Sequence, residues 1–173
     1  DTLDIWDEKI AFAGAEIISD RIDYIKKLKS KATDIYNGIS GEKEELDIKY
    51  LSNIRYESEE KNDIARIYFE SLKKHRPNDL YLKSTTCGPH RDDIEILINK
   101  ISARKFGSQG QQRSASLSLK LGEAEIIKDL KGEHPIILLD DVMSELDSTR
   151  QNYILNKMTG KQVFITCCEK ETI

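Results

Sequence analysis

Apolar residues recur every three or four positions over the first part of the chain, the spacing that places them on one face of a helix. The pattern runs from Leu3 to about Asn37 and predicts one long amphipathic helix. Gly38 and Gly41 follow, and glycine favours the backbone conformations that end helices. A helix of this length spans about 50 Å at 1.5 Å per residue, so we expect part of it to extend from a compact core as an arm.

Two shorter elements are predicted next. The stretch from Leu46 to Ser52 is typical of a strand, and Ser58 to Arg76 carries apolar residues at helical spacing. We expect Pro77 to end this helix, because proline lacks the backbone N–H that a helix interior uses. A domain border near Pro77 would divide the chain into residues 1–77 and 78–173.

Alternating apolar residues then predict a β-hairpin. Ile94, Ile96 and Ile98 alternate with polar residues, Asn99-Lys100 suits a tight turn, and Ile101 to Lys105 would form the returning strand.

The last part of the chain has the order helix, strand, helix, strand. A helix is predicted from about Gln111 to Leu130, and the apolar run Ile136 to Leu139 is typical of a strand covered on both faces. A helix with Ser148 as N-cap and the strand Val163 to Ile165 follow. Two strands joined through a helix indicate a parallel pair, so the fold class is α/β with a mostly helical arm.

Composition narrows the class of protein. The chain has 173 residues, enough to bury a core without disulfides or metals, and a net charge of -4, so it is not basic throughout. Its three cysteines show no CxxC spacing, and no apolar run approaches the length of a membrane span. We therefore expect a cytoplasmic protein without a membrane partner. Because the chain opens inside a predicted helix and not on Met, we expect it to be a piece of a longer protein.

The hexapeptide Ser108 to Arg113 stands at the start of a predicted helix. A helix N-terminus offers unpaired N–H groups and a partial positive charge, Gly110 allows close approach of an anion, and the Ser108 hydroxyl adds a donor. This chemistry suits a phosphate group. The alternative is that Ser108 only caps the helix.

Two carboxylates end the apolar strand, and a further acidic segment follows. Asp140 and Asp141 come directly after Leu139, at the strand end where open α/β sheets bind their ligands. Carboxylates there can hold Mg²⁺ through water or orient an attacking water. Alternatively, the aspartates cap the next turn.

Together these segments resemble the RecF family, SMC-like ATPases of the ABC class. The resemblance rests on three stretches between Thr86 and Thr166: Gly88 to Asp93 (GPHRDD), Phe106 to Arg113 (FGSQGQQR) and Leu138 to Asp147 (LLDDVMSELD). It implies that residues 78–173 are the C-terminal part of an ABC ATPase head, with parallel strands, helices and a β-hairpin. Residues 1–77 would be the mostly helical arm domain.

The resemblance also implies a role for each motif residue. The signature motif would contact ATP bound to an opposing subunit, with Ser108 and Gly110 on the γ-phosphate; its residues are Ser108, Gln109, Gly110, Gln111, Gln112 and Arg113. Asp140 would match the Walker B acid that holds Mg²⁺ through water, and Asp141 would polarise the hydrolytic water. The D-loop, which crosses the dimer interface, would be Ser144, Glu145, Leu146 and Asp147.

The function that the resemblance implies is ATP-dependent DNA binding in recombinational and replication-gap repair, within the SOS response. ATP and Mg²⁺ would be the cofactors, and ATP held between two heads would drive homodimerisation on DNA. Implied partners are single- and double-stranded DNA, gap junctions, and mediators of the RecR and RecO type that support recombinase loading.

Three departures from the family pattern limit catalysis. No GxxxxGK[ST] phosphate-binding loop occurs in the 173 residues, so we expect this chain alone to be inactive and the intact protein to be a weak ATPase. Thr166-Cys167-Cys168 stands where ABC ATPases usually place a histidine, and Asp141 where many relatives have the longer Glu. Both departures predict slow hydrolysis, because the attacking water needs close positioning.

Candidate DNA contacts lie in two places. Between Asn99 and Arg113 the chain has no acidic residue. Together with the GPHRDD stretch, this segment supplies the candidates Arg91, Lys100, Arg104 and Lys105. The other interpretation of the 99–113 stretch is a hairpin edge kept soluble by its charges.

Two functions of other classes stay open. The carboxylates Asp92, Asp93, Asp140, Asp141 and Asp147 could form a two-metal nuclease centre. The chain could also be a non-catalytic interaction module, which predicts that replacing Ser108 has no effect.

Overall fold

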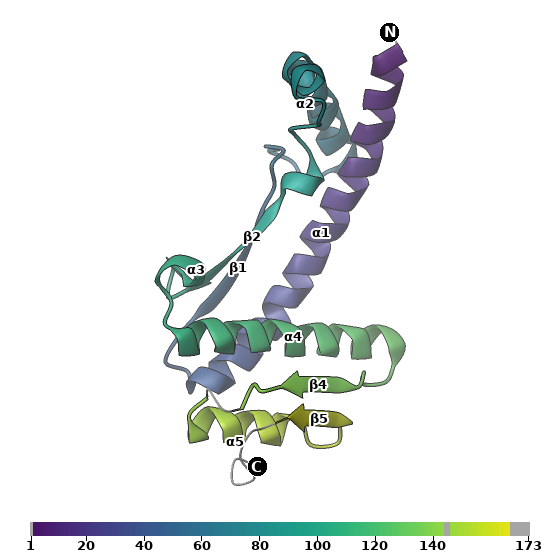
Figure 1. Cartoon of the computed structure of the whole chain (residues 1–173). Helices are drawn as coiled ribbons and strands as arrows, with labels where there is room; N and C mark the ends of the chain where they lie inside the picture. Colours follow the sequence, from purple (N-terminus) through teal and green to yellow (C-terminus); the bar gives the residue numbers. More distant parts are fainter. Residues whose placement is uncertain (1, 144–145, 167–173) are drawn as a thin grey trace. The chain divides into compact units, whose positions relative to one another are not determined.

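The protein mixes helices and strands, as the sequence predicts, and the fold class is confirmed. We describe it from a computed structural model, which covers residues 2–143 and 146–166 (Figure 1). The elements in chain order are α1 (Thr2–Ser40), β1 (Leu46–Leu51), α2 (Lys61–Leu82), the short 3-10 helix η1 (Pro89–Arg91), β2 (Asp93–Ile98), β3 (Ile101–Ser102), α3 (Ala103–Phe106), α4 (Gln109–Lys131), β4 (Ile137–Asp140), α5 (Ser148–Lys157) and β5 (Val163–Thr166).

The chain divides into two compact units. Residues up to Lys26 together with Lys49–Glu95 form the first unit, and Lys27–Ile48 together with the residues from Ile96 onward form the second. The division falls inside α1, β1 and β2, so each of these elements contributes to both units. The domain border near Pro77 is not tested by this division and stays a prediction.

Helix α1 confirms the long amphipathic helix. It ends at Ser40, and Gly41 and Glu42 follow with φ values of 64° and 61°, in the left-handed region that stops a helix. Gly38 did not stop it. A Cβ at Gly38 would lie only 2.1 Å from the ring of Tyr153, so the glycine instead allows α1 and α5 to pack closely.

The first unit is built around the contact of α1 with α2. Its buried cluster consists of Ala11, Ala15, Ile18, Ile22, Ile54, Ile64, Tyr68, Leu72 and Cys87. The prediction that Pro77 ends α2 is wrong, since the helix continues to Leu82 with Pro77 inside it. Beyond the proline, the Asp79 side chain accepts hydrogen bonds from the backbone N–H and the hydroxyl of Thr86, which hold the last turn of α2.

Strands β1, β2 and β3 form a three-stranded sheet in that order. β2 and β3 are the predicted hairpin, with Ile98 opposite Ile101 and positive φ values of 50° and 67° at Asn99 and Lys100 in the turn. The returning strand is shorter than predicted. It ends at Ser102, and the chain turns into α3, whose Ala103 is buried.

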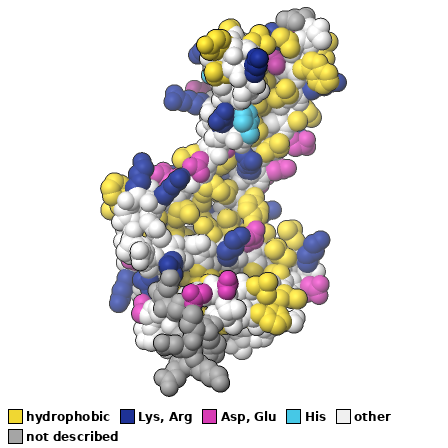
Figure 2. All heavy atoms as spheres, viewed as in Figure 1, with side chains coloured by type: hydrophobic (Ala, Val, Ile, Leu, Met, Phe, Trp, Pro, Cys, Tyr) yellow, Lys and Arg dark blue, Asp and Glu magenta, His cyan; other side chains and the backbone are white. Residues whose placement is uncertain are grey.

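The second unit has a two-stranded parallel sheet, β4 beside β5, with Ile137 opposite Val163 and Asp140 opposite Thr166. One face of β4 packs into the core of this unit, which contains Ile35, Ile39, Leu117, Leu121, Ala124, Ile137, Leu139, Met143, Leu146, Ile154 and Met158. The predicted burial of both faces is wrong for the described part of the chain. Leu138 is 73% exposed and Phe164 57% exposed, and Figure 2 shows hydrophobic side chains gathered on the surface where α4, β4 and β5 lie.

The start of α5 also differs from the prediction. Asp147, and not Ser148, is the N-cap, because its carboxylate accepts the backbone N–H of Arg150 at 3.0 Å. Aspartate and serine are comparable N-caps, so the sequence alone could not choose between neighbours. None of the helices within residues 2–143 and 146–166 is long and apolar enough to cross a membrane.

Candidate functional site

The first turn of α4 is an exposed, capped helix N-terminus. Ser108 accepts the backbone N–H of Gln111 at 3.2 Å, and the side-chain oxygen of Gln111 accepts the backbone N–H of Ser108 at 2.9 Å. This reciprocal pair is a capping box. The cap uses a lone pair of the Ser108 hydroxyl, so its hydrogen is left to donate. Helix geometry also leaves the N–H groups of Gln109 and Gly110 without intrahelical acceptors, and the turn can therefore bind an anion.

The segment before this turn is held from behind. The Gln112 side chain donates to the carbonyl oxygens of Ala103 (3.0 Å) and Gly107 (3.1 Å), which joins α3 to α4. A Cβ at Gly107 would lie 2.6 Å from the Ala103 carbonyl oxygen, so only glycine permits this close approach. The position of Ser108 thus depends on Gly107.

Gln111 is also held from the side, by Glu44. Its amide nitrogen donates to one oxygen of the Glu44 carboxylate at 2.7 Å, and the Tyr36 hydroxyl donates to the other at 2.6 Å. Burial raises the pKa of Tyr36, and its hydrogen bond to Glu44 raises the pKa further, so the phenol stays protonated as a donor. The end of α1 is thereby connected to the anion-facing turn through two side chains.

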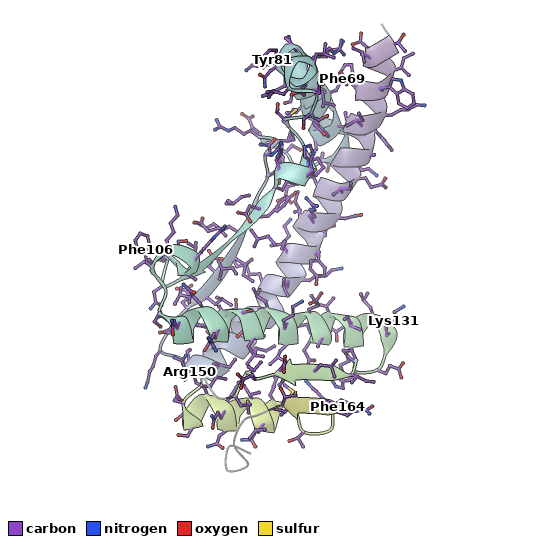
Figure 3. All side chains as sticks on the ribbon, viewed as in Figure 1. Phe69, Tyr81, Phe106, Lys131, Arg150 and Phe164 are labelled. Carbon is purple, nitrogen blue, oxygen red and sulfur yellow. The ribbon has the colours of Figure 1, made fainter. Side chains whose placement is uncertain are left out.

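A third connection joins the turn to the segment before α5. The Nη1 of Arg150 donates to the Gly110 carbonyl oxygen at 3.1 Å and to the Ser114 hydroxyl at 2.8 Å. The Nε of the same side chain pairs with the Asp147 carboxylate at 3.2 Å. Figure 3 shows Arg150 between the start of α5 and the first turn of α4. Gly110 belongs to the predicted signature motif and Asp147 to the predicted D-loop. The side chain of Arg150 contacts both residues and so connects the two motifs.

The two strand-end aspartates lie next to β5. Asp140 accepts the Thr166 hydroxyl at 2.5 Å, and Thr166 accepts the backbone N–H of Asp141 at 3.0 Å. Asp141 has a φ of 48°, an uncommon conformation for a residue other than glycine and one that is found at functional turns. Both aspartates and Arg113 of α4 line one groove of about 420 Å³. The acidic strand end and the end of the predicted signature motif thus share a surface.

Asp140 suits a magnesium ion bound beside phosphates. Its side chain is exposed, and Thr166 engages only one carboxylate oxygen, so the other can accept a water or a cation. Mg²⁺ in phosphate sites is held by one or two carboxylates, with waters and phosphate oxygens completing its ligands.

The carboxylates needed for a two-metal nuclease are not assembled. Among the described residues, no three acidic, histidine or cysteine side chains are grouped to hold a metal. The side chain of Asp92 is 2% exposed and accepts hydrogen bonds from Tyr50, Arg21 and the backbone of Asn53. The carboxylate of Asp92 is thus engaged within the first unit and is not available as a metal ligand of the hypothesised nuclease centre.

The candidate DNA contacts fall into both units. Arg91 is exposed in η1 of the first unit, and the second unit exposes Lys100 in the hairpin turn and Arg104 and Lys105 in α3. These three lie within six residues of one another along the chain. Of the predicted D-loop, Leu146 is buried and Asp147 caps α5, whereas Ser144 and Glu145 lie outside the described residues, as does Cys167 in the position expected of the histidine.

Comparison with known proteins decides the relationship. No protein family model matches the chain. It is 44% identical over 169 residues, 98% of its length, to the DNA replication and repair protein RecF of Clostridium tetani. The chain is homologous to RecF. RecF of Lactobacillus gasseri is 49% identical over 174 residues, and the chain spans 46% of the length of each of these two relatives.

A solved structure agrees with the sequence comparison. The recombination mediator protein RecF with ATP, from the RecFOR pathway, matches 100% of this chain with a TM-score of 0.87 at 45% identity, and the match covers 46% of that RecF chain. A second RecF structure, described with ATPrS, matches with a TM-score of 0.86 at 46% identity. The resemblance to RecF drawn from three motifs therefore extends to the whole chain, including α1 and α2, which carry no motif.

Sequence reasoning missed the residues that hold the RecF-like turn in place. Arg150, Glu44 and Tyr36 belong to no motif, and each reaches the turn only through the tertiary fold. A weak signal exists for Arg150, since an N-cap aspartate followed three residues later by arginine is a favourable local pair.

Proposed function

We propose that the longer protein containing this chain is an ATP-dependent DNA-binding protein of recombinational and replication-gap repair, acting with mediators of the RecR and RecO type. The observation that carries the proposal is the match of the whole chain to RecF with ATP at a TM-score of 0.87. The site geometry supports it, because the first turn of α4 offers a hydroxyl and two backbone N–H groups to an anion.

In this proposal two copies share each ATP. Ser108 and Gly110 of one copy bind the γ-phosphate of ATP held by the other, with Gln109, Gln111, Gln112 and Arg113 completing the signature motif. Asp140 would hold Mg²⁺, and Asp141 would orient the attacking water. Mg²⁺ bound there would supply positive charge beside the phosphates. The segment 144–147 lies at the dimer interface.

ATP then acts as a switch for association. ATP held by one copy gains the contacts of the second copy only in the dimer, so it binds the dimer more tightly than the monomer, and dimer formation rises with the ATP concentration. Duplex or gapped DNA would bind to the closed dimer, and Arg91, Lys100, Arg104 and Lys105 are the proposed phosphate contacts.

Replacing Ser108 by arginine tests this function. Its long charged side chain would fill the space above the first turn of α4, so we expect the full-length Ser108→Arg protein to bind ATP as the wild type does but to remain monomeric. Light scattering with and without MgATP measures dimerisation, and a filter-binding titration measures ATP binding. Gln162→Arg, an exposed change in the described part of the chain, serves as the control and should dimerise normally. Unchanged dimerisation of Ser108→Arg would leave Ser108 as a helix cap only.

A further inference from the structure

Arg150 belongs to no motif, and its side chain contacts three groups near the candidate site. Its guanidinium reaches the Gly110 carbonyl, the Ser114 hydroxyl and the Asp147 carboxylate, at 3.1, 2.8 and 3.2 Å. The side chain is 20% exposed, whereas Asp147 is 60% exposed. Most of the arginine is therefore packed between α4 and α5.

The contacts fix the direction of the guanidinium from both ends. Asp147 accepts the backbone N–H of Arg150 with one oxygen and pairs with its Nε through the other. The guanidinium group is planar and rigid, so the contact that holds Nε also fixes the direction of Nη1. Nη1 donates hydrogen bonds to the hydroxyl of Ser114, a residue that is 1% exposed, and to the carbonyl oxygen of Gly110, one turn earlier on α4.

The guanidinium of Arg150 lies close against Gly110. A Cβ there would lie 3.4 Å from Nη1 of Arg150, so the arginine covers the surface of the helix at this residue. The carbonyl oxygen of Gly110 accepts the hydrogen bond from Arg150. The N–H group of the same residue points the opposite way, to the end of the helix where an anion can bind. Rotation of the first turn would therefore disturb the arginine contact and the anion-facing donors together.

We propose that Arg150 is a positioning residue that locks the Ser108–Gly110 turn to the Asp147 segment, so that both present one fixed interface to the ATP of a second copy. The inference rests on the proposed function for its consequence, but its structural part, the lock itself, is independent of ATP. Arg150 does not touch the nucleotide in this account. It acts through the backbone of Gly110.

A lock of this kind predicts which binding property changes. Each copy would hold its own ATP through other residues, so ATP binding by the monomer should be unaffected by Arg150. The association of two copies needs the turn and the Asp147 segment in register, so dimerisation should need more ATP when the lock is lost. Lysine cannot replace the arginine fully, because one ammonium cannot span three acceptors in a plane.

The test compares Arg150→Ala and Arg150→Lys with wild type and with Arg66→Ala in the full-length protein. Arg66 is a matched control, since it pairs with two acidic residues, Asp63 and Glu70, but on the exposed side of α2. We expect the ATP concentration for half-maximal dimerisation to rise about tenfold or more for Arg150→Ala, less for Arg150→Lys and not at all for Arg66→Ala. ATP binding by the monomers should not change.

A second readout, without nucleotide, keeps the inference separate from the proposed function. Hydrogen exchange of residues 109–114 should become faster in both Arg150 variants and stay unchanged in Arg66→Ala. If exchange and dimerisation both match wild type, Arg150 is not a positioning residue. If exchange accelerates but Ser108→Arg still dimerises with ATP, the lock stands and the proposed function fails. Should Arg150→Ala not fold, the lysine variant decides by the same two measurements.

Discussion

Asp92→Ala is expected to lower the free energy of unfolding by about 3 kcal/mol. The Asp92 side chain is 2% exposed and accepts from Tyr50, from Arg21 at 3.3 Å, and from the backbone N–H of Asn53 at 2.7 Å. Removing the carboxylate takes this acceptor from the Tyr50 hydroxyl and the Asn53 N–H, whereas Arg21 keeps its hydrogen bond to the Pro89 carbonyl oxygen. Arg21 is 45% exposed and can turn to water, so the loss is smaller than for a fully buried ion pair.

Urea unfolding monitored by circular dichroism measures the Asp92 effect. Asp20→Ala is the matched control, because Asp20 lies exposed on α1, and we expect its unfolding free energy to change by less than about 0.5 kcal/mol. We expect the unfolding free energy of Asp92→Asn to lie between those of Asp92→Ala and Asp20→Ala, since the amide keeps the shape of the side chain and one acceptor oxygen. An Asp92→Ala protein as stable as Asp20→Ala would show that the network does not stabilise the first unit.

Gly122→Leu is expected to destabilise the second unit by about 3 kcal/mol, at the upper end of overpacking effects. Gly122 is buried on α4 where this helix crosses α1. A Cβ there would lie 3.2 Å from the backbone nitrogen of Ala32 and 3.3 Å from the Leu28 side chain. Backbone atoms cannot turn aside as a flexible side chain can, so the leucine has to separate the two helices.

A second leucine substitution on α4 serves as the control for Gly122→Leu. Lys120→Leu introduces the same side chain on the same helix at an exposed position, and should change the free energy of unfolding by less than about 0.5 kcal/mol. Equal effects of the two leucines in urea unfolding would contradict a close helix contact at Gly122.

Local patterns predicted the elements whose causes are local. The long helix, the hairpin turn at Asn99-Lys100 and the cap at Ser108 follow from spacing, from residues that accept positive φ and from side-chain hydrogen bonds within a few residues. The errors arose where tertiary contacts decide. One face of β4 is open because no described segment covers Leu138. Helix α2 continues past Pro77, which the local rule for proline does not anticipate.

The same distinction between local and tertiary causes applies to the residues of the candidate site. Its motif residues could be read from order and spacing, because a helix start and a strand end carry their chemistry locally. The residues that fix the turn could not. Glu44 reaches Gln111 across 67 positions of the chain and Arg150 reaches Gly110 across 40, so only the folded chain brings them together.

The most direct test of shared ATP mixes two inactive full-length variants. Ser108→Arg removes the signature contact, and Asp140→Asn removes the magnesium carboxylate, so neither should hydrolyse ATP alone. In a mixed dimer one site combines Asp140 of the first variant with Ser108 of the second. Ser108→Arg is not expected to pair with itself, and each mixed dimer keeps one intact site of two, so ATP turnover should return on mixing to at most about half of the wild-type value. No recovery on mixing, with both variants folded and binding ATP, would show that Ser108 and Asp140 act within one copy and would contradict the account.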